Sequence, residues 1–177
     1  PTQAGGVQRT DTQEIKVIGV RRRIAVQMQE SKRRIPHFSY VEEIDVTDVE
    51  ALRAALNAKW AAERGKLTLL PLLMRALILA VQEFPQINAL FDDDQGVVTR
   101  HGGVHIGIAT QTPHGLMVPV VRHAEARSMW AMSEEVTRLA EAARAGRATR
   151  AEMSGSTITI SSLGALGGIV STPVINR

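Results

Sequence analysis

The alternation of apolar and polar positions divides the first third of the chain into a helix, a strand and a second helix. Between residues 17 and 34, apolar side chains recur at the spacing of one helix face. Pro36 ends this helix, because a residue before proline disfavours the α conformation. Residues 37–46 alternate and predict a strand. Thr47 and Glu50 have capping-box spacing, so we expect a helix from Thr47 to about Gly65.

The rest of the chain continues the mixture of helices and strands. The expected elements are a buried helix 69–84, a strand 97–99 after the turn 92–96, a hairpin of strands 105–110 and 116–122, a helix 128–145, and a terminal strand 157–160. Thr149 and Glu152 again have capping-box spacing and predict a short helix. This order predicts an α+β fold, a mixed β-sheet with helices packed on it.

The first residues of the chain differ from the rest. Residues 1–13 are polar and aperiodic and contain Gly5-Gly6, so we interpret them as the end of a linker. Residues 14–177 then form the domain. No apolar run reaches the roughly 20 residues of a bilayer span, so we expect no membrane insertion.

Composition adds three points to this picture. The chain has 177 residues and no cysteine, which excludes disulfides, a thiolate nucleophile and a cysteine-ligated metal. Its net charge of +3 includes two basic triplets, 21–23 and 32–34, which could contact nucleic acid. Without aromatic residues between them, a solvated face or a subunit contact is the better interpretation, and we expect no nucleic-acid partner. The preference for arginine over lysine indicates a bacterial cytoplasmic protein, with a mitochondrial matrix protein as the alternative.

Few residues suggest chemistry by their spacing. The five histidines are scattered without metal-ligand spacing, and the acidic run 92–94 is better explained as a solvated turn than as a cation site, so no metal is predicted. Ser161 and Ser162 end the last strand, before a glycine-rich segment. They could be a nucleophile pair, an oxyanion donor or ordinary strand residues, and composition alone favours the last interpretation.

Several short motifs change that balance because they occur together and in order. They are RIAxxM at 23–28, SK at 31–32, IPHF at 35–38, EIDVT at 43–47, FPxINA at 84–89, GIAxxTxxGLxVPV at 107–120, and the segment 157–176. With these motifs, the chain resembles the catalytic domain of dihydrolipoamide acyltransferases, the E2 cores of 2-oxo acid dehydrogenase complexes. Segments 38–45 and 163–176 are most similar to the branched-chain type.

The resemblance implies a fold like that of chloramphenicol acetyltransferase and a homotrimer that assembles into a larger core. It implies transfer of an acyl group, of the 2-methylpropanoyl rather than the acetyl type, between dihydrolipoyl-lysine and coenzyme A. The lipoyl group would be carried by a separate domain, and the E1 and E3 components of the complex would be partners. The basic helix 17–34 would pack on a neighbouring subunit.

The resemblance also implies roles for individual residues. Ser161 matches the serine that stabilises the tetrahedral oxyanion, and the coenzyme A contacts fall on Arg53, Thr68, Gln111, Ser161 and Ser162. Gln111 departs from the branched-chain pattern, in which aspartate is common. The family's general base lies in a His-x-x-x-Asp-Gly motif that does not occur in residues 1–177. We therefore expect the base beyond Arg177 and negligible turnover by these residues alone.

Two alternative functions remain at this point. One is a small-molecule O-acetyltransferase of the chloramphenicol acetyltransferase type. The other is a scaffold subunit without turnover.

Overall fold

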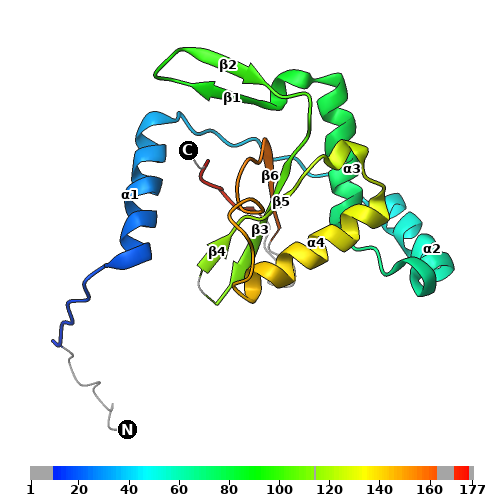
Figure 1. Ribbon diagram of the computed structural model, residues 1–177, viewed down its shortest axis with the longest axis horizontal. Helices are drawn as coiled ribbons and strands as arrows, with labels where there is room; N and C mark the ends of the chain where they lie inside the picture. The colour runs from blue at the N-terminus through cyan, green and yellow to red at the C-terminus, as the bar shows by residue number, and fades with distance from the viewer. Residues whose placement is uncertain (1–9, 114, 163–169, 176–177) are drawn as a thin grey trace, which may run out of the picture. The chain divides into compact units, whose positions relative to one another are not determined.

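The computed structural model describes residues 10–113, 115–162 and 170–175. The chain divides into two compact units, one formed by Pro1–Glu42 with Ile169–Arg177 and the other by Glu43–Gly168 (Figure 1). The first unit contains helix α1 (Gly19–Arg34). The second contains α2 (Thr47–Arg64), α3 (Leu69–Glu83), η1 (Pro85–Ile87), β1 (Ala89–Asp92), β2 (Val97–Arg100), β3 (Ile106–Thr112), β4 (Gly115–Met117), β5 (Val120–Val121), η2 (Ala124–Ala126), α4 (Met129–Arg144) and β6 (Ile158–Ser161).

The segment between α1 and α2 is not a strand. The strand predicted for residues 37–46 is wrong, because a strand requires a hydrogen-bonded neighbour and residues 36–46 have no ladder partner within the described chain. The side chains of Phe38 and Tyr40 are 92% and 80% exposed. His37 is the anchor of this segment: its Nδ1 lies 2.8 Å from the Ile35 carbonyl oxygen, and its Nε2 accepts the Ile175 backbone N–H at 2.9 Å.

Helix α2 begins where the sequence predicted, but not through a capping box. Val46 is the N-cap residue and makes no side-chain cap bond. The Asp45 carboxylate accepts the Thr47 backbone N–H at 2.9 Å instead, and the Glu50 carboxylate pairs with Arg53. In place of the predicted capping box, the carboxylate of Asp45, two residues before Thr47, accepts a backbone N–H at the start of the helix. Gly65 ends the helix at φ 79°, a conformation that glycine adopts without steric cost.

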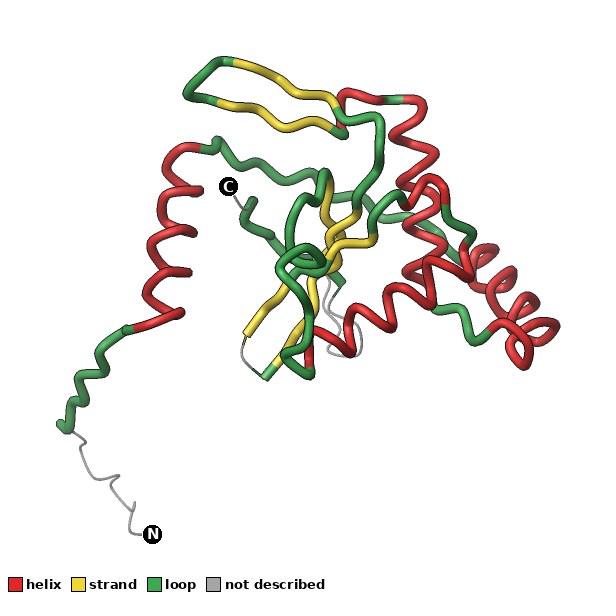
Figure 2. Tube along the Cα trace, viewed as in Figure 1, coloured by secondary structure: helices red, strands yellow, loops and turns green. Residues whose placement is uncertain are grey.

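The second unit contains two separate sheets (Figure 2). Strands β1 and β2 form an antiparallel hairpin. In the larger sheet, β3 pairs antiparallel with β4 and β5 and parallel with β6. This sheet is mixed and is accompanied by helices, which confirms the predicted α+β class. The helices and the final strand predicted at 69–84, 128–145 and 157–160 correspond to α3, α4 and β6.

The core of the second unit lies between the larger sheet and helices α3 and α4, which contact each other. It consists of Met74, Ile78, Val81, Val104, Ile106, Ile108, Val121, Ala124, Met132 and Leu139. Ile158 and Ile160 of β6 pack against it. Within the described chain, no helix taken singly has the length and apolar content of a membrane span; α2 and α3 reach it only together, and they are bent by 106°.

Gly107 lies where β3 is flanked on both sides, pairing with Val120 of β5 and Thr159 of β6. A Cβ atom at this position would lie 2.9 Å from Thr159 Oγ1 and 2.9 Å from Val118 Cγ1. Only glycine therefore allows the side chains of the neighbouring residues to approach β3 this closely.

The second predicted capping box forms, but without a helix. The Thr149 backbone N–H donates to Glu152 Oε2 at 2.8 Å, and the Glu152 N–H donates to Thr149 Oγ1 at 3.2 Å. Residues 150–153 are turns, so the predicted short helix is wrong. The bond from Thr149 and a second one from Arg138 lower the pKa of Glu152 to about 2.

Candidate active site

Ser161 lies at the carboxyl end of β6 with its side chain exposed. Along this strand, Ile158 and Ile160 pack on the core, while Thr159 and Ser161 are exposed. Because successive side chains of a strand point to opposite faces, the Ser161 hydroxyl points away from the core. A hydroxyl in this position can contact a bound molecule.

Gln111 and Ser162 belong to the same end of the sheet. Ser161 is in register with Ala109 of β3, and the two strands are parallel, so their carboxyl ends coincide. Gln111 follows Ala109 by two residues on β3, and Ser162 directly follows β6; both are exposed. The structure therefore brings three of the predicted site residues to one sheet end. The glycine-rich segment 163–169 lies outside the described residues.

Arg53 and Thr68 form a second set, at the junction of α2 and α3. Arg53 Nη1 donates to the Leu67 carbonyl oxygen at 3.4 Å, and that carbonyl belongs to the peptide bond that leads into Thr68. Thr68 is exposed and is the N-cap residue of α3, although its hydroxyl makes no cap bond with the helix. A guanidinium and a hydroxyl thus lie near the positive end of a helix dipole, where negative charge is stabilised.

An ion pair holds the Arg53 guanidinium. Glu50 Oε2 accepts from Arg53 Nη2 at 2.6 Å and from Nε at 2.9 Å. The bond with Arg53 keeps the pKa of Glu50 below its usual value, and the same bond raises the pKa of Arg53. Because both side chains are still partly exposed to water, the pair orients Arg53 more than it stabilises the fold.

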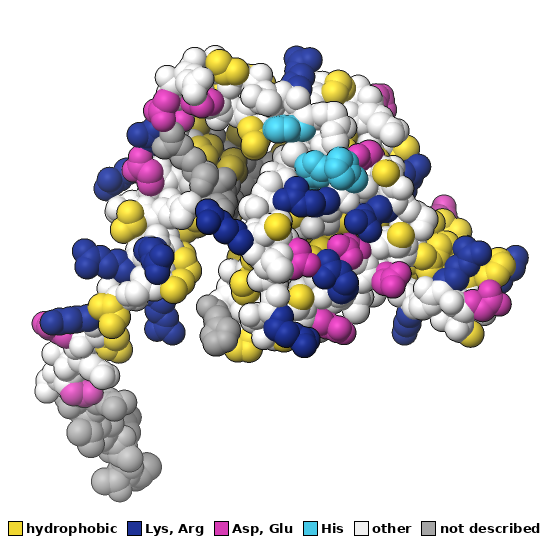
Figure 3. All heavy atoms as spheres, viewed as in Figure 1, with side chains coloured by type: hydrophobic (Ala, Val, Ile, Leu, Met, Phe, Trp, Pro, Cys, Tyr) yellow, Lys and Arg dark blue, Asp and Glu magenta, His cyan; other side chains and the backbone are white. Residues whose placement is uncertain are grey.

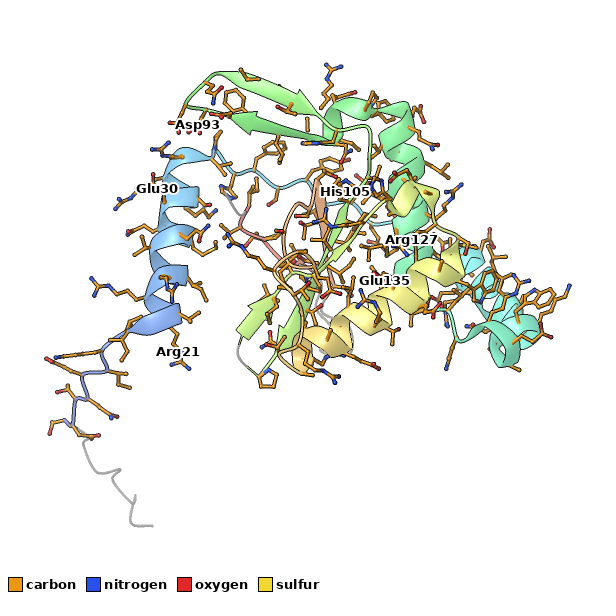
Figure 4. The ribbon with its side chains drawn as sticks, in the orientation of Figure 1. Arg21, Glu30, Asp93, His105, Arg127 and Glu135 are labelled. Atoms are coloured by element: carbon orange, nitrogen blue, oxygen red, sulfur yellow. The ribbon has the colours of Figure 1, made fainter. Side chains whose placement is uncertain are left out.

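The structure also contains a histidine cluster that the sequence did not indicate. The His105 and His123 rings meet edge to face with centroids 4.5 Å apart. His105 Nδ1 accepts the His123 backbone N–H at 3.0 Å, and His123 Nδ1 lies 3.0 Å from Glu125 Oε1. Figure 3 shows histidine side chains gathered beside basic ones, and Figure 4 labels His105. His123 has φ 48°, rare for a residue other than glycine.

The surroundings of the cluster shift the pKa values of two of its groups. Burial, then the neighbouring His123 and Arg122, lower the pKa of His105. Burial alone would raise the pKa of Glu125, but hydrogen bonds from the Val104 backbone N–H, its own N–H and His123 outweigh it, so this pKa lies below its usual value. A neutral His105 that accepts at Nδ1 carries its proton on Nε2, which leaves no lone pair for a metal.

The acidic turn has the structural role favoured by the sequence. Carboxylate oxygens of Asp92, Asp93 and Asp94 lie within 4.8 Å of one another, and all three side chains are exposed. Asp92 Oδ1 accepts the backbone N–H groups of Asp94 and Gln95, each at 3.0 Å. These bonds close the hairpin between β1 and β2.

Sequence reasoning missed Glu50, Asn57 and the His105–His123 pair. Glu50 and Arg53 are three residues apart on a predicted helix, so that ion pair could have been foreseen. Asn57 and His105 bond to backbone groups that lie 10 and 18 residues away, and no local pattern encodes such contacts.

Comparison with known proteins places these features in a family. The family model of the 2-oxoacid dehydrogenases acyltransferase (catalytic domain) matches residues 9–177. The lipoamide acyltransferase component of the branched-chain α-keto acid dehydrogenase complex from Pseudomonas aeruginosa is 67% identical over 173 residues, 98% of this chain and 40% of that protein. The dihydrolipoyllysine-residue acetyltransferase component of the pyruvate dehydrogenase complex from Staphylococcus epidermidis is 42% identical over 163 residues, 92% of this chain and 37% of that protein.

A solved structure agrees with the sequence comparison. The cubic core of the pyruvate dehydrogenase multienzyme complex matches with a TM-score of 0.86 and 36% identity, over 94% of this chain and 68% of that chain. The chain spans about two fifths of the length of the curated relatives it matches. The expected resemblance is confirmed, and the chain belongs to the 2-oxoacid dehydrogenase acyltransferases, within their catalytic domain.

Proposed function

We propose that this chain is part of the acyltransferase core of a branched-chain 2-oxo acid dehydrogenase complex. In this role it transfers an acyl group between dihydrolipoyl-lysine and coenzyme A. The observation that carries the proposal is the 67% identity to a branched-chain relative over 98% of the chain, against 42% for a pyruvate-complex relative. On this basis we favour a 2-methylpropanoyl substrate over an acetyl one.

In the proposed reaction, Ser161 stabilises the transition state. Attack of a thiol on the thioester carbonyl gives a tetrahedral intermediate with negative charge on the former carbonyl oxygen. A hydroxyl already oriented toward that oxygen lowers the barrier, since it donates most strongly when the charge has developed. The exposure of Ser161 at the end of β6 supports this role.

The proposed coenzyme A contacts draw on both sets of residues. Arg53 can pair with a phosphate, and the Thr68 hydroxyl can donate to one beside the N-terminus of α3. Gln111 and Ser162 lie with Ser161 at the sheet end, where the thiol end of the cofactor has to react. Gln111 can hydrogen-bond the cofactor, but without the charge assistance that an aspartate would provide.

Proton transfer requires a base, because a thiol with a pKa near ~8.5 is mostly protonated at neutral pH. The proposal gives this step to a histidine of a His-x-x-x-Asp-Gly motif, which residues 1–177 do not contain. Two histidines of this chain are poorly suited to it. His37 and His105 each use a ring nitrogen to accept a backbone N–H.

Association with other chains completes the proposal. We propose a homotrimer that assembles into a larger core and works with a lipoyl domain and the E1 and E3 components. Supporting this, the first unit exposes large apolar side chains on and after α1, among them Ile24, Val26, Phe38 and Tyr40. Such a concentration of exposed apolar surface is typical of a protein interface.

Substitution of Ser161 tests the reaction in the intact protein. Ser161→Ala should lower kcat for transfer between 2-methylpropanoyl-CoA and dihydrolipoamide by about 10²-fold, with KM nearly unchanged. Thr159→Val is the matched control, because it removes another exposed hydroxyl from the same face of β6 and should leave kcat unchanged. A change in KM alone would make Ser161 a binding residue. Preference for chloramphenicol as acceptor would favour the small-molecule acetyltransferase instead.

A further inference from the structure

Asn57 of α2 binds the backbone of the segment between α2 and α3 at two points. Its Oδ1 accepts the Leu67 N–H at 2.8 Å, and its Nδ2 donates to the Leu67 carbonyl oxygen at 2.9 Å. The carboxamide thus satisfies both polar groups of one residue, as a neighbouring strand does in an antiparallel sheet. A side chain bound in this way fixes the position of Leu67 as well as supplying hydrogen bonds.

Among the described residues, the backbone N–H and carbonyl groups of Leu67 have few other hydrogen-bond partners. The residue is fully buried and lies between Gly65, which ends α2, and Thr68, the N-cap residue of α3. A buried backbone group without a partner is costly, so the segment depends on its contacts with α2. The remaining contact is the longer one from Arg53 Nη1, at 3.4 Å to the same carbonyl oxygen.

Arg53 and Asn57 are one turn apart and lie on the same face of α2. Both reach the peptide bond that leads into Thr68. Arg53 and Asn57 thus hold the residue directly before Thr68 from the same helix. Glu50, one turn earlier on that face, pairs with the Arg53 guanidinium.

We infer that Asn57 is a positioning residue of the coenzyme A site, acting through Leu67 to hold Thr68 and the start of α3 beside Arg53. The inference rests on the proposed function, in which Arg53 and Thr68 contact the cofactor. Asn57 itself touches no reacting atom. Its removal should therefore weaken binding of coenzyme A and leave the chemical step unchanged.

The test measures steady-state kinetics of the intact protein with Asn57→Ala and a matched control, Asn88→Ala. Asn88 is a buried residue whose carboxamide, like that of Asn57, holds backbone groups: it donates to the His101 and Gly103 carbonyl oxygens at 2.7 and 3.0 Å. Both substitutions should lower the unfolding temperature. Only Asn57→Ala should raise KM for coenzyme A, by about tenfold, with kcat and KM for the dihydrolipoyl substrate within twofold of wild type. Asn57→Gln, a longer carboxamide, is the second variant if Asn57→Ala is not recovered folded, and it should raise KM for coenzyme A in the same way.

Arg53→Ala separates this inference from the proposal on which it rests. If Arg53→Ala raises KM for coenzyme A and the Asn57 variants do not, Asn57 has no positioning role. If Arg53→Ala itself leaves this KM unchanged, the cofactor contacts are assigned wrongly and the inference fails with them. An equal rise for Asn57→Ala and Asn88→Ala would indicate a general loss of structure and would also overturn it.

Discussion

Gly107→Ala should destabilise the protein through the pairing of β3 with its neighbours. The added Cβ would lie 2.9 Å from Thr159 Oγ1 and Val118 Cγ1 and 3.3 Å from Ser156 Cβ. Ordinary contacts of this kind begin at 3.4 Å, so two of the three neighbours must move by about half an ångström. Such overpacking costs about 1–3 kcal/mol. For a domain of this size, Tm changes by roughly 2–4 °C per kcal/mol, which predicts a fall of about 2–12 °C.

The assay is thermal unfolding followed by circular dichroism, together with kcat. Thr159 belongs to the strand that ends in Ser161, so a displaced β6 should also lower kcat. Gly102→Ala is the control, because a Cβ added there would have no neighbouring atom within 4 Å, and its Tm should stay within about 2 °C of wild type. Val118→Ala in the Gly107→Ala background should recover part of the loss. An unchanged Tm for Gly107→Ala would refute the close approach on which this reasoning depends.

Two further predictions concern charged groups. The pKa of His105 in the folded protein lies below its ordinary value of 6.5. The contribution of this group to the free energy of unfolding should therefore be fully present above pH 6.5 and be lost as the pH falls below it. The reason is that a protonated ring can no longer accept the His123 N–H. Urea unfolding at pH 5 and pH 7.5 measures this change in the free energy of unfolding. His105→Asn keeps a hydrogen-bond acceptor but cannot titrate, so the change between the two pH values should be smaller in this variant. The same change in wild type and variant would contradict the prediction. Glu50→Gln should raise KM for coenzyme A, because the Arg53 guanidinium loses the ion pair that orients it; a lower KM would mean that Glu50 competes with the cofactor for Arg53.

Elements that are encoded by residues close together in the sequence could mostly be predicted. Helices α3 and α4 follow from apolar spacing, and Ser128 caps α4 by accepting the Ala131 N–H. The acidic turn and strand β2 were also predicted, whereas β1, which pairs with β2, was not. Residues 37–46 alternate between apolar and polar side chains, as a strand does, yet they do not form one. Alternation gives a chain the capacity to pair, and the partner comes from elsewhere.

The candidate site could be predicted one residue at a time but not as an arrangement. The resemblance pointed to Arg53 and Thr68 separately. Nothing in their spacing indicated that the Arg53 side chain would bond to the peptide group that precedes Thr68. That link depends on Asn57, an ordinary helix residue by pattern. Likewise, His105 and His123 are isolated histidines in the sequence until the antiparallel pairing of β3 and β5 brings them together.

The parallel pairing of β3 with β6 affects the order in which the protein can fold. The β3–β4 contacts close over a few residues, whereas the bond from the His105 N–H to Thr157 Oγ1 joins residues 52 apart. Contacts of such long sequence separation form late, because the intervening chain must first lose its freedom. The strand that carries Ser161 should therefore be among the last to assemble, and mutations that slow this step would reduce the yield of active protein without altering the final structure.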